Sequence, residues 1–168
     1  PEAIRYLARR FQDPKVGAVA GKIAVRNRTK LITRLQGLEY ATAQNFDRRA
    51  FDPINGLMVV PGAIGAWRTS AIKEAGLFSN ETITEDADLT LAVIRAGYRV
   101  TYEDKALANT DAPDSVRSLL AQRLRWSLGM FQCAWKHKKA FAEGRAVGLV
   151  TLPDMFLFGY VFPLLAPI

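Results

Sequence analysis

The chain has 168 residues, of which 49% are hydrophobic and 23% are charged, so it can bury one sizeable core and is not expected to be disordered. Its single cysteine, Cys133, excludes an intrachain disulfide and a multi-cysteine metal site, and its single histidine, His137, excludes a histidine-rich catalytic centre. The net charge of +7 favours an anionic partner, which can be nucleic acid, anionic lipid or a phosphorylated substrate.

Positive charge is concentrated directly before an apolar C-terminal segment. Between Asp114 and Arg145 the only acidic residues are Asp114 and Glu143. The basic residues of this stretch are Arg117, Arg123, Arg125, Lys136, Lys138, Lys139 and Arg145. Basic residues beside an apolar segment are typical of the cytoplasmic face of a membrane. The charge pattern therefore favours a membrane-associated protein.

The first residues predict a helix followed by a strand. Residues 1–11 carry apolar side chains near helical spacing, and Asp13-Pro14 ends that helix. Residues 16–25 are rich in Val, Ala and Ile, as in a buried strand, so the order indicates an α/β sheet. A long amphipathic helix is expected next, because a stripe at steps of three and four runs through Leu31, Leu35, Leu38, Thr42 and Phe46.

The segment 57–67 predicts a strand that glycines interrupt. Gly62 and Gly65 permit a ligand to approach the backbone closely, although a bulge or a tight bend explains them equally well. A short helix over 70–75, closed by Gly76, is expected to follow.

The run Thr84-Glu85-Asp86 opens a helix expected over 85–96, with Asp88 in its first turn and a strand over 98–102 after it. Crowded carboxylates repel one another, which raises the proton affinity of at least one, whereas the helix N-terminus favours the anion. A carboxylate balanced between these effects can accept a proton from a sugar hydroxyl as a general base. Acidic residues in a first helical turn are also ordinary complements to the helix dipole, and spacing alone favours that interpretation.

A second polar group lies in a helix expected over about 115–138. The apolar stripe of this helix is Val116, Leu120, Leu124, Leu128, Phe131 and Trp135. The opposite side carries Gln122, Arg125, Trp126 and Gly129. Arg123 is expected to point elsewhere, so it ranks below these residues as a substrate-binding candidate. A guanidinium fork suits a diphosphate, and an indole offers a platform for a sugar ring. The alternative is an amphipathic helix at a membrane surface, and both interpretations can hold for different faces.

The two groups together resemble the motifs of a known enzyme family. Thr84-Glu85-Asp86, followed by Gln122-Arg123-Leu124-Arg125-Trp126 starting 36 positions after Asp86, resembles the TED and Q-x-x-R-W pair of processive family 2 glycosyltransferases. These enzymes are the cellulose, chitin, hyaluronan and poly-N-acetylglucosamine synthases. The run Val60-Pro61-Gly62-Ala63-Ile64-Gly65-Ala66-Trp67-Arg68 resembles the strand that precedes TED in the poly-N-acetylglucosamine branch. The likeness covers almost the whole chain.

The resemblance implies an inverting hexosyltransferase with the C-terminal half of a GT-A fold. By this likeness Asp86 deprotonates the acceptor hydroxyl, which attacks the anomeric carbon of a UDP-sugar as UDP leaves. Gln122 and Arg125 hold the pyrophosphate, Trp126 stacks under the acceptor end of a growing β-linked polysaccharide, and Glu85 positions its neighbours. The transferred sugar is expected to be N-acetylglucosamine or glucose, with preference for the first.

The resemblance also implies a nucleotide-binding half of the enzyme that has no counterpart in these residues. The family's nucleotide-binding first half, with its D-x-D metal motif, is absent from this sequence, so no metal ligand is assigned. The full-length enzyme is expected to use Mg²⁺ or Mn²⁺. We therefore expect this chain alone to be inactive, and detectable turnover of a UDP-sugar by it would refute that expectation.

Three regions follow from the resemblance and the hydropathy. Residues 1–112 are expected to form the C-terminal half of the catalytic domain, and residues 113–146 an amphipathic interfacial region. Residues 147–168 are expected to form an interfacial turn and the start of a transmembrane helix, because roughly 20 apolar residues suffice to cross a bilayer. Asp154 interrupts this region and is expected at the interface or facing protein. A buried helix of a soluble domain is the alternative.

The expected setting is the inner (plasma) membrane, with the catalytic part in the cytoplasm. Expected partners are a UDP-sugar donor, a polysaccharide acceptor and membrane lipids, and an accessory membrane or secretion subunit is a further candidate. No nucleic-acid partner is expected, because no recognised nucleic-acid motif occurs. Two rivals stay open: a non-processive family 2 transferase that adds one sugar to a lipid or protein, and a non-catalytic basic module that binds membranes or nucleic acid. The Q-x-x-R-W motif argues against the first, and the second leaves the acidic cluster unexplained.

Overall fold

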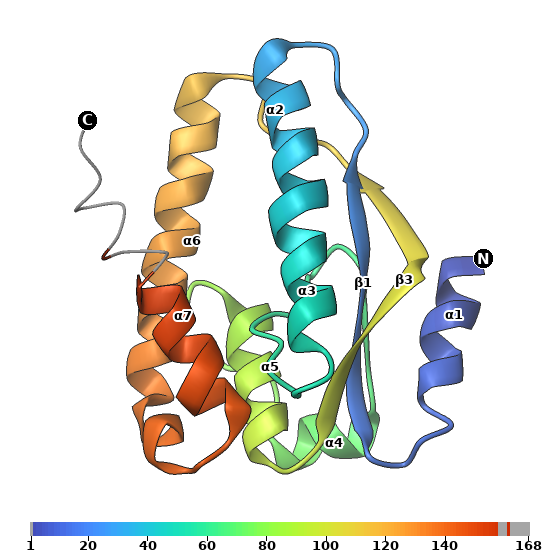
Figure 1. Ribbon diagram of the computed structural model, residues 1–168, viewed down its shortest axis with the longest axis vertical. Coiled ribbons are helices and arrows are strands. Elements are labelled where there is room, and N and C mark those ends of the chain that lie inside the picture. The colour runs from blue at the N-terminus through green and yellow to red at the C-terminus, as the bar shows by residue number, and fades with distance from the viewer. Residues whose placement is uncertain (1, 158–160, 162–168) are drawn as a thin grey trace.

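The computed structural model describes residues 2–157 and residue 161 (Figure 1). The elements in chain order are α1 Glu2–Arg10, β1 Val16–Val25, α2 Leu31–Glu39, the π-helical turn η1 Tyr40–Gln44, α3 Asn45–Phe51, β2 Gly65–Trp67, α4 Thr69–Glu74, α5 Glu85–Arg95, β3 Arg99–Thr110, α6 Val116–Lys136, the 3-10 turn η2 Lys138–Ala142, the π-helical turn η3 Val147–Thr151 and α7 Leu152–Phe156.

The sheet is mixed and has β1 at its centre. β1 pairs antiparallel with β2, where Val19 lies opposite Ala66, and parallel with the long strand β3, where Val19 lies opposite Thr101. β1 is buried along almost its whole length, as its run of small and branched apolar residues predicts. The expected α/β sheet is thus present.

Two boundaries differ from the sequence expectation. Within 57–67 only Gly65–Trp67 forms a strand, because the Val60 amide donates to the Thr90 hydroxyl of α5, at 2.9 Å, rather than to a strand. β3 extends to Thr110, well past the expected end, because β1 is long enough to pair with it as far as Val25.

The main core lies between the sheet and α5. It includes Ala18 of β1, Val60, Leu89 and Val93 of α5 and Val100 of β3. A smaller cluster packs α1 against the other face of the sheet, and Figure 1 shows α1 apart from the remaining helices, across the strands. Each fully buried Leu or Val contributes about 1.5–3 kcal/mol, so the core fixes α5 firmly to the sheet.

Asn45, at the start of α3, occupies the free edge of β1 beyond the point where β2 stops. Its side-chain oxygen accepts from the Ile23 amide at 3.2 Å, and its side-chain nitrogen donates to the Ile23 carbonyl at 2.9 Å. One buried amide therefore completes both backbone hydrogen bonds of that strand residue and attaches α3 to the sheet.

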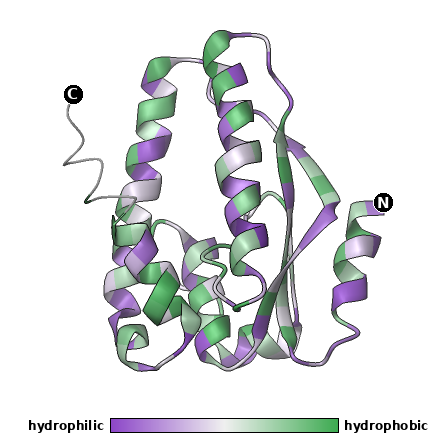
Figure 2. Cartoon of the chain, viewed as in Figure 1, coloured by the Kyte–Doolittle hydropathy of each residue, from purple (hydrophilic) through white to green (hydrophobic). Residues whose placement is uncertain are grey.

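The helices carry the expected apolar stripes, but these stripes face outward. The exposed members are Leu31, Leu35, Leu38 and Phe46 on α2 and α3, and Val116, Leu120, Leu124, Leu128, Phe131 and Trp135 on α6. Figure 2 shows hydrophobic residues along both helices. The inward sides instead carry small or polar residues, such as Gln36 and Gly37 on α2 and Gly129 and Cys133 on α6.

No helix in residues 2–157 or at residue 161 is both long enough and apolar enough to cross a membrane. Residues 147–157 begin with η3 and α7, and α7 contains Asp154. The rest of the expected transmembrane start, apart from Val161, lies outside the described residues.

Candidate functional site

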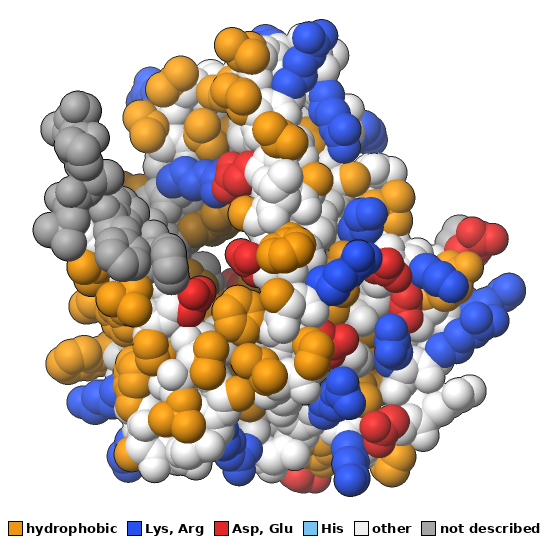
Figure 3. Space-filling view, in the orientation of Figure 1, with side chains coloured by type: hydrophobic (Ala, Val, Ile, Leu, Met, Phe, Trp, Pro, Cys, Tyr) orange, Lys and Arg blue, Asp and Glu red, His pale blue; other side chains and the backbone are white. Residues whose placement is uncertain are grey.

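A cavity of about 660 Å³ lies between α6, α3 and the N-terminus of α5. The segments that line it include the loop before β2, the end of β3 and α7. Figure 3 shows the hollow in the molecular surface, with acidic side chains beside it. Of the candidate catalytic and binding residues predicted from the sequence, those that line it are Gly62, Thr84, Asp86, Gln122, Arg123 and Trp126.

Asp86 lies in the first turn of α5 and is partly buried. Its Oδ2 accepts a hydrogen bond from the Gly62 amide at 3.1 Å, and its Oδ1 accepts one from the Ala87 amide at 2.9 Å. A Cβ atom at Gly62 would lie 3.7 Å from Oδ2, which is ordinary contact. The carboxylate is therefore held by two backbone amides at the cavity wall.

Thr90 connects the start of α5 to the segment that precedes Gly62. Its buried hydroxyl donates to the Asp86 carbonyl at 2.6 Å and accepts from the Val60 amide at 2.9 Å. Both hydrogen-bonding functions of the hydroxyl are thus used inside the protein.

Helix α6 approaches the start of α5 closely at Gly129. A Cβ atom at this position would lie 2.5 Å from Thr84 Cγ2, so only glycine permits the contact. The Thr84 hydroxyl lies 3.4 Å from Cys133 Sγ, and Gln132 accepts from the Ile83 amide at 2.9 Å. This contact brings Gln122 and Trp126, on the preceding turns of α6, to the cavity.

Arg123 lines the cavity, so the expectation that it points elsewhere is wrong. Its guanidinium donates to both carboxylate oxygens of Glu39 at 2.7 and 2.6 Å and lies 4.8 Å from the ring centroid of Trp126. The ion pair with α2 draws the side chain inward, which the position of Arg123 on the helix does not indicate.

Three of the expected site residues lie elsewhere. Arg125 is exposed on α6, and Glu85 is exposed on α5; neither lines the cavity. Gly65 lies in β2, also away from the cavity, where a Cβ atom would meet Val60 Cγ1 at 2.5 Å, so this glycine serves close packing. The cavity wall therefore includes Gln122 and Trp126 but not Arg125.

Sequence reasoning missed several charged residues of the cavity. Arg48 on α3 is only 8% exposed, and burial lowers its pKa, opposed by nearby groups that include Asp47 and Asp86. Burial raises the pKa of Asp47, and the neighbouring Asp154 raises it further. The place of Arg48 and Asp47 in the cavity wall could not be predicted from the local sequence, because both lie in a helix with an amphipathic pattern. Asp154, expected at an interface or facing protein, lines the cavity.

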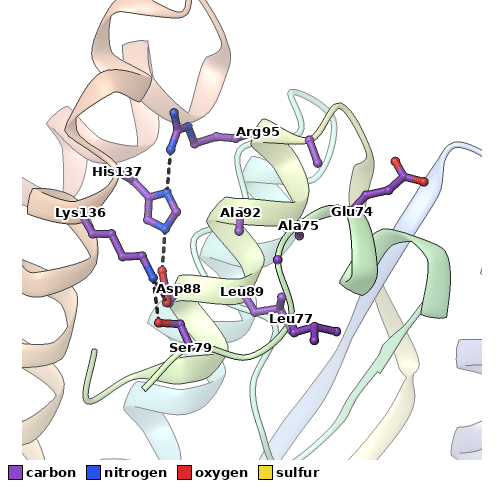
Figure 4. Close-up of a pocket in the computed structure, with 12 residues that line it drawn as sticks. Glu74, Ala75, Leu77, Ser79, Asp88, Leu89, Ala92, Arg95, Lys136 and His137 are labelled. Carbon is purple, nitrogen blue, oxygen red and sulfur yellow. Dashed lines mark hydrogen bonds and ion pairs between the residues drawn. The ribbon is translucent and has the colours of Figure 1, made fainter. Parts of the chain in front are cut away.

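A polar clasp joins α5 to the C-terminal end of α6 (Figure 4). The buried carboxylate of Asp88 lies 2.6 Å from His137 Nε2 and accepts from Lys136 at 2.8 Å. Arg95 Nη1 lies 3.1 Å from His137 Nδ1, and the same guanidinium pairs with Glu143. Arginine can only donate, so Nδ1 of His137 accepts, and the N–H at Nε2 donates a hydrogen bond to the Asp88 carboxylate.

The clasp favours a neutral imidazole. Burial lowers the pKa of His137 below its ordinary value of 6.5, and the Arg95 and Lys136 charges lower it further, whereas Asp88 opposes the change. A second proton on the ring would place an N–H against the Arg95 guanidinium.

The described residues contain no group of three or more His, Cys, Asp or Glu side chains that could hold a metal ion. The acidic residues around the cavity therefore do not fit a divalent cation by themselves, because such ions take several converging oxygen ligands.

Comparison with known proteins finds a glycosyltransferase family and relatives that are themselves glycosyltransferases. The family model described as glycosyl transferase family group 2 matches residues 1–167. A poly-β-1,6-N-acetyl-D-glucosamine synthase of Staphylococcus aureus (strain COL) is 30% identical over 129 residues, covering 76% of this chain and 31% of the relative. An N-acetylglucosaminyltransferase of Rhizobium sp. (strain N33) is 34% identical over 140 residues, covering 78% of this chain and 31% of the relative. The chain thus spans a minor part of both proteins.

A solved structure shows the same fold in part. A mannosyltransferase of Pyrobaculum calidifontis, solved with GDP-mannose and Mn²⁺, matches with a TM-score of 0.59 and 21% identity. The match covers 82% of this chain and 34% of that structure. At this identity the likeness concerns the fold alone, and it agrees with the α/β fold seen in this chain.

The contact between α6 and α5 predicts a cost for any side chain at position 129. Gly129→Ala should lower the free energy of unfolding by about 1–3 kcal/mol, because the new methyl group overlaps the Thr84 side chain. Chemical denaturation would measure the change. Thr84→Ala in the same molecule should recover part of the loss, and an undiminished loss in the double variant would contradict the proposed contact.

The clasp predicts a pH dependence of stability. Because the folded state disfavours the charged imidazole, the contribution of His137 is complete above pH 6.5 and is lost progressively below it. The slope for one proton is at most about 1.4 kcal/mol per pH unit. His137→Gln should flatten the stability profile below pH 6.5, and denaturation curves at several pH values would test this. Equal slopes for both proteins would refute it.

Proposed function

Because the chain belongs to the glycosyl transferase family group 2, we propose that it forms the acceptor side of the catalytic centre of an inverting glycosyltransferase. The reaction transfers a sugar from a UDP-sugar to the end of a growing β-linked polysaccharide. The relatives from Staphylococcus aureus and Rhizobium, a poly-β-1,6-N-acetyl-D-glucosamine synthase and an N-acetylglucosaminyltransferase, favour N-acetylglucosamine over glucose.

One observation carries the proposal: Asp86, Gln122 and Trp126, from two elements far apart in sequence, line one cavity. In the proposed step, a hydroxyl of the terminal acceptor sugar gives its proton to the Asp86 carboxylate. The hydroxyl oxygen forms the new bond to the anomeric carbon of the donor while the bond to UDP breaks on the opposite side, which inverts that carbon. UDP leaves with the bonding electron pair.

The backbone amides of Gly62 and Ala87 suit Asp86 to this role. They hold the carboxylate in one orientation, at 3.1 and 2.9 Å, without neutralising it through a paired cation. A general base needs a fixed position within hydrogen-bond reach of the proton that it takes. Glu85, exposed and outside the cavity, is proposed to position neighbours rather than to transfer protons.

The indole of Trp126 is proposed to stack under the acceptor sugar, because it combines an apolar face with one polar edge. The Arg123 guanidinium over its ring and the bidentate pair with Glu39 hold it in place. Gln122 and Arg125 are proposed to meet the donor pyrophosphate. Arg125 is exposed, so the donor would approach from that face of α6.

Membrane association and processive synthesis belong to the same proposal. The outward apolar stripes of α2 and α6, together with the basic residues of 114–145, suit contact with lipid headgroups and acyl chains at the cytoplasmic face of the inner membrane. Mg²⁺ or Mn²⁺ is proposed for the full-length protein, with ligands outside the residues described here.

The base assignment predicts a specific loss of turnover. In the full-length protein that carries this chain, Asp86→Asn should lower kcat by about 10²- to 10⁴-fold and leave the acceptor KM within a few-fold, because the amide keeps the shape but cannot take the proton. Radiolabelled sugar incorporation would measure both constants.

Asp104→Asn is the matched control, because Asp104 is an exposed acid on β3 that pairs with Arg49 away from the cavity. Its turnover should equal that of the wild type. Near-normal kcat in Asp86→Asn would eliminate Asp86 as the base.

A further inference from the structure

Arg48 is a buried cation whose side chain makes almost no hydrogen bonds. It lies on α3, lines the cavity and is 8% exposed. Its Nε has no partner. Its Nη1 makes one long hydrogen bond, 3.4 Å, to the Asn45 side-chain oxygen, which already accepts from the Ile23 amide. Within residues 2–157 and residue 161, the Arg48 guanidinium forms no ion pair with a carboxylate at 4.0 Å or less.

This arrangement costs stability and therefore calls for a ligand. A guanidinium has five N–H donors, and a buried charge is unfavourable unless it is paired and hydrogen-bonded. The other arginine of the cavity differs, because both carboxylate oxygens of Glu39 accept from Arg123. Gln122 Oε1, also in the cavity wall, is buried without a partner. The cavity wall thus contains two side-chain groups without a hydrogen-bond partner: Nε of Arg48 and Oε1 of Gln122.

The charges around the cavity indicate what kind of ligand fits. The lining carboxylates are Glu39, Asp47, Asp86, Asp111 and Asp154, and the lining guanidiniums are those of Arg48 and Arg123. This surplus of negative charge opposes an oxyanion. A neutral sugar suits it, because each hydroxyl can accept from a guanidinium and donate to a carboxylate or amide oxygen. The volume of about 660 Å³ lies within the range of small-molecule sites, about 300–1,000 Å³.

We propose that Arg48 is a binding residue for the acceptor glycan. Its guanidinium donates to a hydroxyl or N-acetyl carbonyl oxygen of a sugar that lies in the cavity beside Asp86 and Trp126. The inference rests on the function proposed above and adds a residue of α3 to the groups on α5 and α6. In this arrangement the sugar is bound from three helices.

The test compares Arg48→Gln with Arg49→Gln in the full-length protein. Arg49 is the matched control, because it is the adjacent arginine of α3, is exposed, pairs with Asp104 and does not line the cavity. The probe is a β-1,6-linked N-acetylglucosamine oligosaccharide, added as acceptor with UDP-N-acetylglucosamine as donor. The constants measured are kcat and the KM of each substrate, together with oligosaccharide binding by calorimetry and the Tm without ligand.

Arg48→Gln should raise the acceptor KM and the oligosaccharide Kd by about 10- to 100-fold, as expected for the loss of a charged hydrogen bond. The donor KM should not change. The Tm should stay equal or rise, because an unpaired buried charge is removed. Arg48→Lys keeps the charge but loses the guanidinium donors, and its acceptor KM should also rise. Arg49→Gln should behave as the wild type.

Each contrary result has a separate meaning. Unchanged acceptor constants in Arg48→Gln, with or without a lower Tm, would overturn the role of Arg48 while the proposed function stands. A change confined to the donor KM and to inhibition by UDP would show that Arg48 serves the diphosphate, and it would overturn the acceptor assignment. Failure of the wild type to bind or extend any oligosaccharide would overturn the proposed function, and the role of Arg48 with it.

Discussion

The geometry of the cavity depends on the buried hydroxyl of Thr90. It joins the Asp86 carbonyl in the first turn of α5 to the Val60 amide, and Gly62 then lies where its own amide reaches the Asp86 carboxylate. The Thr90 side chain is fully buried, and an unpaired buried polar group costs about 1–3 kcal/mol. The position of the acidic side chain is therefore determined by the hydrophobic core beneath it, and a surface loop could not provide comparable rigidity.

Periodicity in the sequence located the elements better than it oriented them. The buried strand at β1 and the helices α5 and α6 were predicted near their observed positions, because a run of branched residues and a three-to-four repeat are local signals. The side of a helix that meets the sheet is not a local property. On α2 and α6 the inward sides carry small and polar residues, because close backbone contacts such as that of Gly129 with Thr84 leave no space for large side chains.

The same limit applies to the cavity. The spacing of the two motifs singled out Asp86, Gln122 and Trp126, which line it, and also Arg125, which does not. Arg123 turns inward toward Glu39 on α2, a residue 84 positions away along the chain. Arg48 belongs to a helix whose pattern suggests a solvated polar face, so its burial follows only from the packing of α3 against the sheet. Local sequence therefore identifies side chains that are capable of catalysis or binding, whereas tertiary packing decides which of them lie together.

The attachment of Asn45 to Ile23 also affects how the protein can associate. A strand with free backbone amides and carbonyls is a template on which another chain can add a strand, and aggregation begins at such edges. Beyond β2 the exposed side of β1 would be such a template, but the Asn45 side chain already occupies both backbone groups of Ile23. The sheet is thereby closed to edge-to-edge growth on the side where α3 lies.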